Sequence, residues 1–279
     1  MVIGELFLIL FGLIWIIFAV VQDLRKREIA NWLNFSLVIF ALVFRFFYSM
    51  FNNQGYNFFF QGVIGFVFFL IIGNLLYYGK VFAGGDAKLM IGLGAIVPFS
   101  GNFLSNINSS LMFLLFFLVG GALYGVVLAV YLGVKNRKVF VKEFSKEFKK
   151  SRKVFYIAVI SGIILILLAF FEILFLYLGI LVFIAPYVYF AAKSIDEACM
   201  IKKVNTKNLT EGDWLYKDVK LGRKLIEAKW SGLSKEEITF LRRKKKDVLI
   251  REGIPFSPVF LISYVGLIYA LVLGKISLF

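Results

Sequence analysis

The chain has 279 residues, of which 61% are hydrophobic and 18% charged, whereas a soluble domain of this size carries roughly 25% charged residues. It contains no His and a single Cys, Cys199, which excludes an intrachain disulfide, a Cys/His zinc site and a His-based triad. A net charge of +15 would suggest nucleic acid in a soluble protein, but here it is explained by the loops of a membrane protein. We therefore expect no nucleic acid, metal or cofactor, and acid–base chemistry is left to Asp, Glu, Lys, Tyr and water.

Uninterrupted apolar blocks of about 20 residues follow one another along the chain, and a helix of that length crosses the hydrocarbon of a bilayer. The alternating segments of a membrane barrel are absent, so backbone satisfaction favours helices. We predict eight transmembrane helices, at about 2–22, 33–51, 58–79, 87–104, 111–133, 154–171, 173–192 and 256–277. The sixth and seventh come from one apolar run that is too long for a single span, which indicates a hairpin turning near Glu172.

The Lys and Arg residues predict the orientation of these helices. Four connections hold 30 of the 32 Lys and Arg: 23–32, 80–88, 134–153 and 193–255. The connections 52–57 and 105–110 hold none. By the positive-inside rule the basic connections are cytoplasmic, and both termini are then outside. The first block lacks a basic n-region and carries Glu5, so we interpret it as a true span and not as a removable signal.

The segment 193–255 is the largest polar part of the chain. We predict a transmembrane core over 1–192, a basic cytoplasmic insert over 193–255 and a last transmembrane helix within 256–279. Ser234 and Glu237 form a capping-box pattern, which predicts the start of a helix. The expected fold is an all-α polytopic membrane protein with a small helical insert. The basic run 242–246 is interpreted as a solvated or lipid-facing helix end, or as a docking site for anionic lipid or a partner.

Two acidic residues lie where predicted spans meet the cytoplasmic surface. Asp23 ends the first span and Asp86 begins the fourth, so the predicted topology places both at the same depth on the same side. Carboxylates at a membrane border are costly and are candidate functional groups. Taken singly, Asp23 could pair with Arg25 or Arg27, and Asp86 could cap a helix. The matched pair favours a functional interpretation.

Two nearby carboxyl groups share a proton and can activate water for attack on a peptide carbonyl. Asp86 precedes a helix and Asp23 follows one, so the helix dipoles favour Asp86 as the base and Asp23 as the acid, although a coupled pair titrates as a unit. Gly84 and Gly85 allow the backbone ahead of Asp86 to leave helical geometry, and an extended substrate could then pair with it. Lys88 either favours the Asp86 carboxylate or is a snorkelling interface residue.

These residues resemble the motifs of the GxGD-type aspartic prepilin peptidase family. The first motif is matched by Asp23, Arg25, Ile29 and Asn31, and the second by Gly85, Asp86, Lys88 and Leu89. Ala30 stands where Pro is usual in the family, and Ala83 stands where the first motif Gly is usual. The likeness covers residues 1–135, and the stretch before the last span is similar to archaeal members less specifically.

The resemblance implies an aspartic endopeptidase that removes short basic leaders from prepilin-like or prearchaellin proteins at the cytoplasmic membrane, with the active site facing the cytoplasm. Asp23 and Asp86 would be catalytic, and a further set would form the motif and the substrate approach: Gly84, Gly85, Lys88, Arg25 and Asn31. The connection after the first span is short and lacks Cys, so the resemblance is to the archaeal form without methyltransferase activity.

The basic leader of such a substrate would meet a strongly basic face. Acidic residues that could receive it are Glu28, Asp196, Glu197, Glu211 and Asp213. Two other functions stay open on the sequence alone. One is a proton-coupled transporter that uses the same two aspartates, although transporters place such groups near the midplane and often show repeats, which are absent here. The other is a non-enzymatic scaffold of a surface filament. The sequence assigns no role to Arg45 and does not define the oligomeric state.

Overall fold

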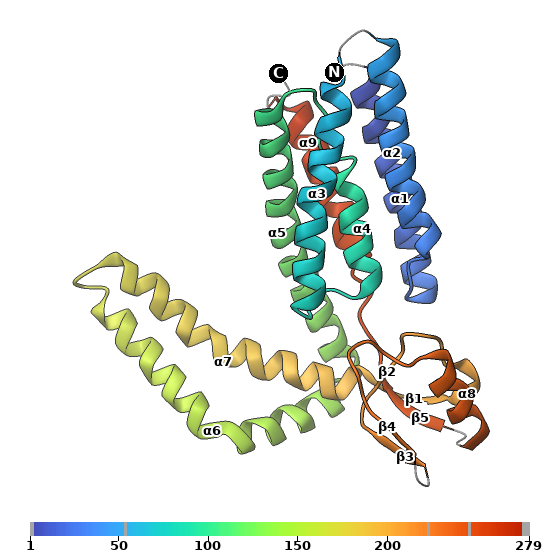
Figure 1. The fold of residues 1–279 in the computed structure, drawn as a ribbon. Helices are drawn as coiled ribbons and strands as arrows, with labels where there is room; N and C mark the ends of the chain where they lie inside the picture. Colours follow the sequence, from blue (N-terminus) through green and yellow to red (C-terminus); the bar gives the residue numbers. More distant parts are fainter. Residues whose placement is uncertain (1–2, 53–54, 222–223, 245–246, 275–279) are drawn as a thin grey trace. The chain divides into compact units, whose positions relative to one another are not determined.

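The computed structural model describes residues 3–52, 55–221, 224–244 and 247–274. The chain forms two compact units, the first from residues 1–124 with 254–279 and the second from 125–253 (Figure 1).

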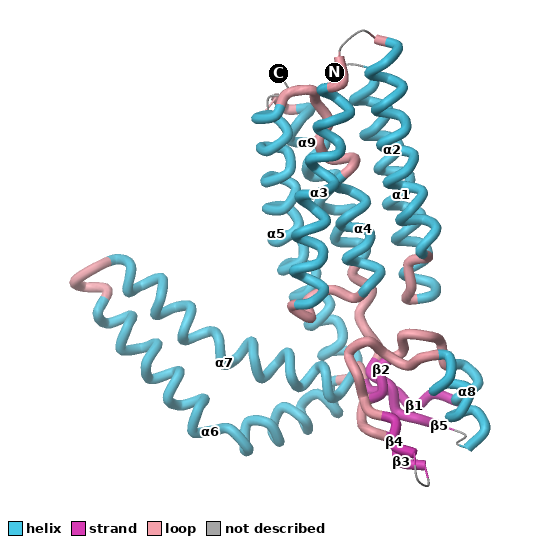
Figure 2. The backbone as a smooth tube through the Cα atoms, viewed as in Figure 1, coloured by secondary structure: helices cyan, strands magenta, loops and turns pink. Residues whose placement is uncertain are grey.

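The first unit is a bundle of helices. It contains α1 (Ile3–Lys26), α2 (Asn31–Phe51), α3 (Asn57–Tyr78), α4 (Gly84–Gly94), the first two thirds of α5 (Phe103–Lys135) and α9 (Ser257–Val272). Figure 2 shows these helices side by side, with loops at their ends. Leu8, Leu37, Phe113 and Phe260 are fully buried between them. Tyr264 of α9 is also fully buried, and its hydroxyl donates to the Ile9 carbonyl of α1 at 3.2 Å, which ties the last helix to the first.

The predicted fourth span is wrong as a continuous helix, because α4 ends at Gly94 and residues 95–102 are irregular. Pro98 lacks the amide that a helix needs, and its ring clashes with the preceding turn. Arg45 of α2, which is fully buried, bonds the carbonyls of this segment instead. Its Nε donates to Ala95 at 2.9 Å, Nη1 donates to Phe58 at 2.8 Å, and Nη2 donates to Ile96 at 3.3 Å and to Pro98. Non-helical backbone at membrane depth is tolerated where it is satisfied inside protein in this way.

The second unit contains a helical hairpin of α6 (Arg137–Leu168) and α7 (Ile173–Cys199). Glu172 is the residue before α7, so the predicted hairpin and its turn are confirmed. The two helices approach closely at Gly162, where an added Cβ would lie 2.7 Å from the Phe183 backbone nitrogen. The helix α6 begins well before the predicted span and kinks at Ser151, so the basic stretch ahead of the kink is helical.

The prediction of a helical insert is wrong, because the described residues of 201–251 contain five short β-strands besides one α-helix. The strand β5 (Asp247–Arg251) pairs antiparallel with β1 (Ile201–Asn205) and β2 (Trp214–Leu215). A separate hairpin pairs β3 (Val219–Leu221) with β4 (Lys224–Ile226). One α-helix, α8 (Lys235–Lys244), lies among the described residues of this segment, and Leu241 on it is fully buried.

The predicted helix start at the capping box is confirmed. The Glu237 carboxylate accepts from the Ser234 amide at 2.9 Å, and the Ser234 hydroxyl accepts from the Glu237 amide at 3.3 Å. In the basic run, Arg242 donates to the carbonyls of Thr206 and Leu209 at 3.1 and 3.0 Å, which is a structural contact. Residues 245 and 246 of the run lie outside the described residues.

Six helices in the described part of the chain are long and apolar enough to cross a membrane: α1, α2, α3, α5, α6 and α7. The helix α9 is apolar but shorter, at 16 residues. The chain is therefore a helical polytopic membrane protein, as predicted. The number of eight spans, the outward position of the termini and the three-part division of the chain stay predictions.

Candidate active site

Asp23 lies in the last turn of α1 with its side chain only 7% exposed. The helix ends because Arg27 takes a left-handed conformation, with φ of 56°, and its amide donates to the Asp23 carbonyl at 2.7 Å. The carboxyl group is thus held at the end of the apolar segment and is turned into the bundle.

The Asp23 carboxylate caps the N-terminus of α9. The Ser257 amide, at the first position of that helix, donates to Asp23 Oδ2 at 3.1 Å. The preceding residue, Phe256, has no side chain that can cap, and Pro258 has no amide to offer. Asp23 therefore supplies from another helix the acceptor that a local Ser or Asp usually provides, and the positive end of the α9 dipole makes this a good position for an anion.

Asp86 lies in the first turn of α4. The chain leaves α3 through Lys80, another left-handed residue with φ of 59°, and the amide of Val81 donates to the Leu76 carbonyl at 2.9 Å. Ala83 is extended and precedes the helix, and its amide hydrogen-bonds the Asp86 carboxylate. Each of the two acids therefore lies beside a turn made by a left-handed basic residue.

The two acids interact. Asp86 precedes the apolar part of α4 and lies outside the six long spanning helices. Burial, and next the nearby negative charge of Asp23, raise the pKa of Asp86 to about 7, against the smaller opposing effect of the Ala83 amide. A carboxyl with this pKa holds its proton in weakly acidic solution. The raised pKa of Asp86 is the reverse of what the dipole of its own helix alone would favour.

The two sequence motifs touch each other. Lys88 Nζ donates to Asn31 Oδ1 at 2.6 Å, so the first turns of α4 and α2 are joined two residues after Asp86. A Cβ on Gly85 would meet the Ile29 side chain at 3.4 Å. Residues from both motifs thus line one border of the bundle, as the matched depth of the two acids predicted.

Several expectations about neighbouring residues are changed. Gly84 and Gly85 are the first residues of α4 and neither has a left-handed φ, so the predicted departure from helical geometry at these glycines is wrong. The irregular backbone precedes them and ends at Ala83. Arg25 is exposed and has no hydrogen bond or ion pair among the described residues, so it does not pair with Asp23.

The structure explains why Ala30 can replace the usual proline. Ala30 has φ of −62° and ψ of 136°, a conformation that proline also adopts. Its amide, which proline would lack, donates to Gln22 Oε1 at 3.1 Å. At the other departure, Ala83, φ is −69°, so the position does not require a glycine.

Two further helices, α9 and α5, contribute to the site, and the sequence pattern did not predict this. The Tyr124 hydroxyl of α5 donates to the Pro255 carbonyl at 2.8 Å, just ahead of α9. Phe256 packs on Phe82 and Phe117, with ring centroids 6.1 and 5.7 Å apart, and an added Cβ on Gly121 would lie 3.2 Å from its ring. The Pro-Phe-Ser-Pro stretch signals a helix start, but only the fold brings it to Asp23, 234 residues earlier.

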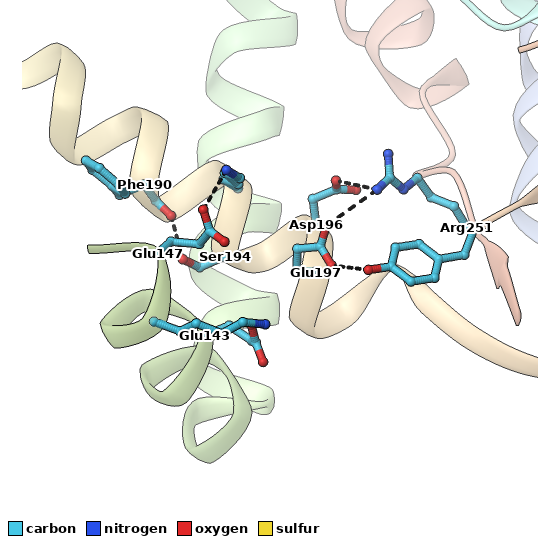
Figure 3. Close-up of polar contacts among 10 residues, drawn as sticks. Glu143, Glu147, Phe190, Ser194, Asp196, Glu197 and Arg251 are labelled. Carbon is cyan, nitrogen blue, oxygen red and sulfur yellow. Dashed lines mark hydrogen bonds and ion pairs between the residues drawn. The ribbon is translucent and has the colours of Figure 1, made fainter. Parts of the chain in front are cut away.

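The acidic residues proposed for a basic leader are largely engaged in the second unit. Arg251 Nη2 lies 3.2 Å from Asp196 and 3.7 Å from Glu197 (Figure 3). Glu197 also accepts from the Tyr216 hydroxyl at 2.8 Å. Glu211 pairs with Lys235 at 3.4 Å, and Asp213 accepts from the Thr210 amide at 2.8 Å.

Glu28 differs from these acids. It lies in the first unit, is exposed, and has no hydrogen bond or ion pair among the described residues.

The fold and this site define a polytopic helical membrane protein with two interacting aspartates at the ends of α1 and α4. Residues 10–132 match the profile of the type IV leader peptidase family. The matched region contains both Asp23 and Asp86.

Curated preflagellin peptidases are similar to part of the chain. The chain is 37% identical over 87 residues to a preflagellin peptidase of Methanococcus maripaludis, a match that covers 31% of this chain and 37% of the relative. It is 34% identical over 87 residues to a preflagellin peptidase of Methanocaldococcus jannaschii, covering 31% and 36%. A preflagellin peptidase of Methanococcus voltae is 28% identical over 135 residues, covering 45% and 56%. The chain thus spans between about a third and about half of each relative's length. No solved structure matches the chain.

Proposed function

We propose that this protein is a membrane aspartic endopeptidase that removes short leader peptides from prepilin-like or prearchaellin precursors, with Asp23 and Asp86 as its catalytic pair. The observation that carries the proposal is the pair of acids itself: burial, and next the nearby charge of Asp23, raise the pKa of Asp86 to about 7, while Asp23 accepts from the amide of Ser257. Aspartic peptidases need such a pair, with one carboxylate and one protonated acid. The match of residues 10–132 to the leader peptidase family supports the same activity.

The reaction needs no cofactor. The Asp23 carboxylate takes a proton from water, and the water oxygen attacks the carbonyl carbon of the scissile peptide. Asp86 donates its proton to the carbonyl oxygen, which gives a neutral tetrahedral intermediate. Transfer of the proton from Asp23 to the peptide nitrogen, with collapse of the intermediate and return of a proton to Asp86, breaks the C–N bond and restores the pair.

The border position of the pair suits a precursor with a short polar leader and an apolar helix. The leader stays in water and the apolar helix stays in the bilayer, so the scissile bond lies at the depth of the acids. We assign the site to the cytoplasmic face of a multi-pass protein of the cell membrane, because 30 of the 32 Lys and Arg lie in the four connections of that side. Glu28, exposed five residues after Asp23, is the acidic side chain best placed in this unit to receive a basic leader.

Lys88, Asn31, Gly84, Gly85 and Arg25 form the approach to the acids in this proposal. The Lys88–Asn31 hydrogen bond fixes the start of α4 against α2, while Arg25 stays exposed. The short connection between α1 and α2 has no Cys, so we propose peptidase activity without methyltransferase activity. Membrane lipid is the partner that contacts the exposed apolar faces of the spanning helices in this proposal.

The experiment is cleavage of a prearchaellin or a type IV prepilin by the purified protein in detergent or proteoliposomes. We expect wild-type protein to release the leader, and Asp23→Asn and Asp86→Asn to lose at least ~10³-fold in kcat. Glu5→Gln, which changes a carboxyl at the other end of α1, is the matched control and should keep wild-type activity. Cleavage by either Asn variant at the wild-type rate would overturn the proposal. Proton-coupled flux without cleavage would favour the transporter, which the comparisons do not support.

A further inference from the structure

The residue that holds the Asp23 carboxylate also carries an unsatisfied hydroxyl group. Ser257 is fully buried, its amide donates to Asp23 Oδ2 at 3.1 Å, and its Oγ has no hydrogen-bond partner among the described residues. A buried hydroxyl without a partner costs free energy, and native proteins keep few of them. This unpaired hydroxyl belongs to the residue whose amide bonds the candidate catalytic carboxylate. It is therefore a candidate for a functional role.

The position of Ser257 limits what its hydroxyl can contact. Ser257 is the first residue of α9, and its amide already points at Asp23. The hydroxyl and the amide belong to the same residue, so a rotation about χ1 alone can bring Oγ toward the same carboxylate. A Ser side chain changes rotamer on a picosecond-to-nanosecond timescale where space allows, and no backbone movement is needed.

The backbone of this helix start is fixed by other contacts. Tyr124 donates to the Pro255 carbonyl at 2.8 Å, and Phe256 packs against Phe82 and Phe117. Pro258 further restricts the chain on the other side. The Ser257 side chain is therefore the adjustable part of a rigid element, which is the arrangement expected of a group that orients a reacting side chain.

The Asp23 carboxylate has room for such a donor. Within the part of the chain that the structure describes, this carboxylate accepts one hydrogen bond, from the Ser257 amide. A carboxylate has about four lone-pair sites, and the water that it activates needs only one. A second donor would fix the plane of the carboxyl group and leave one oxygen directed at the water.

We propose that Ser257 is a positioning residue of the active site whose hydroxyl donates a second hydrogen bond to Asp23 and orients it toward the attacking water. This inference rests on the proposed peptidase function. It adds α9, which lies outside the matched region 10–132, as a third element of the site. The hydroxyl transfers no proton to or from the substrate, so no bond of Ser257 is made or broken.

The chain supplies a matched control. Ser109 of α5 is also fully buried and its Oγ is also unpartnered among the described residues, but it lies 15 residues before Tyr124 on the same helix. At 1.5 Å per residue this places it roughly 22 Å along the helix from the residue that contacts the start of α9. A general effect of deleting a buried unpaired hydroxyl is therefore measured by Ser109→Ala, away from the acids.

The experiment measures kcat, KM and the thermal midpoint of wild type, Ser257→Ala, Ser257→Thr and Ser109→Ala with one cleavable precursor. We expect Ser257→Ala to lower kcat by about tenfold or more, the effect of losing a hydrogen bond to a charged group, with KM within about twofold of wild type. We expect Ser257→Thr to restore most of kcat. The thermal midpoint of Ser257→Ala should not fall, because the hydroxyl has no partner to lose in the resting structure.

The outcomes are distinguishable. Wild-type kcat in Ser257→Ala overturns the positioning role and leaves the peptidase proposal intact. Equal losses in Ser257→Ala and Ser109→Ala also overturn it, since the effect would then come from packing. If the methyl group of Ser257→Thr lowers the thermal midpoint, the positioning role is judged from kcat of Ser257→Ala against kcat of Ser109→Ala. A wild-type protein that cleaves no precursor overturns the proposed function, and this inference with it.

Discussion

Lys88 of α4 donates a hydrogen bond to Asn31 of α2 at 2.6 Å, and this contact joins the two motifs that carry Asp23 and Asp86. Both side chains are exposed, so water competes for the bond and its contribution to folding is small. Its value is geometric. The bond fixes the first turn of α4 against the first turn of α2. Asp86 lies two residues before Lys88, so its backbone is held by the same contact.

The first prediction concerns this contact. Lys88→Met and Asn31→Ala should each lower kcat/KM by about three- to tenfold, because either change frees the first turn of α4. The double variant should lose little more than either single variant, so the coupling in a double-mutant cycle should be ~0.6–1.4 kcal/mol, close to the loss in one single variant. Lys26→Met, which removes another exposed cation near the same border, is the control. Fully additive losses would show that the two side chains act separately.

The second prediction concerns pH. Burial and Asp23 raise the pKa of Asp86 to about 7, so Asp86 holds its proton below that pH and loses it above. An acid must be protonated to donate, and kcat should therefore fall as pH rises through about 7. The charged group that influences Asp86 is Asp23 on α1, whereas Lys88, two residues further along α4, bonds Asn31. A pH–rate profile of precursor cleavage in proteoliposomes measures this fall in kcat, which is the alkaline limb of the profile.

Lys88→Met provides the control for that profile. If Lys88 rather than Asp86 caused the alkaline limb, the limb should disappear in this variant, whereas an Asp86 limb persists. A rate that stays constant from about pH 6 to 9 would contradict the role of Asp86 as the acid.

The sequence predicted the features that depend on local pattern. The apolar blocks predicted the long helices, and the capping box at Ser234 predicted the start of α8. The common cytoplasmic side that the Lys and Arg residues assign to Asp23 and Asp86 stays a prediction. Each of these follows from hydrophobic length, charge or one turn of helix. The raised pKa of Asp86 did not follow from local pattern, because burial and the nearby Asp23 outweigh the dipole of its own helix, and the contact between Asp23 and Ser257 joins residues of two different helices.

The errors in the fold have physical causes as well. The fourth span was predicted as one apolar helix, but Pro98 ends it and Arg45, from another helix, satisfies the freed carbonyls. The insert was predicted to be helical from one capping box. Its strands β1 and β5 are short, and the segment between them is far longer than a hairpin turn, so no local pattern paired them. Pairing between distant strands and contacts between residues of different helices are the features that sequence patterns leave undetermined.

The third prediction concerns Arg45. Its guanidinium is fully buried and bonds the carbonyls of residues 58, 95, 96 and 98. Arg45→Met keeps apolar bulk but leaves these carbonyls without a donor, so we expect the protein to lose at least ~3 kcal/mol of stability. Thermal or denaturant unfolding in detergent measures the loss. Arg152→Met, at an exposed position of α6, should leave stability unchanged. A stable Arg45→Met protein would mean that water reaches this segment.

The fourth prediction concerns Tyr124, whose hydroxyl donates to the Pro255 carbonyl at 2.8 Å while its ring packs against Phe256, with centroids 6.3 Å apart. Tyr124→Phe removes the hydrogen bond and keeps the ring. The backbone ahead of α9 then loses the hydrogen bond that restrains it. The Ser257 amide becomes more mobile and orients the Asp23 carboxylate less well. We expect kcat to fall about three- to tenfold, with a loss of only ~1 kcal/mol in stability.

Tyr78→Phe is the matched control, because Tyr78 is 77% exposed at the end of α3. The pair of variants separates two explanations of the Tyr124 contact. If Tyr124 only stabilised the bundle, its Phe variant would lower the thermal midpoint and leave kcat of the folded protein unchanged. If it positions α9 for Asp23, kcat falls while KM stays within about twofold, since the scissile bond is still bound but its attacking water is less well oriented.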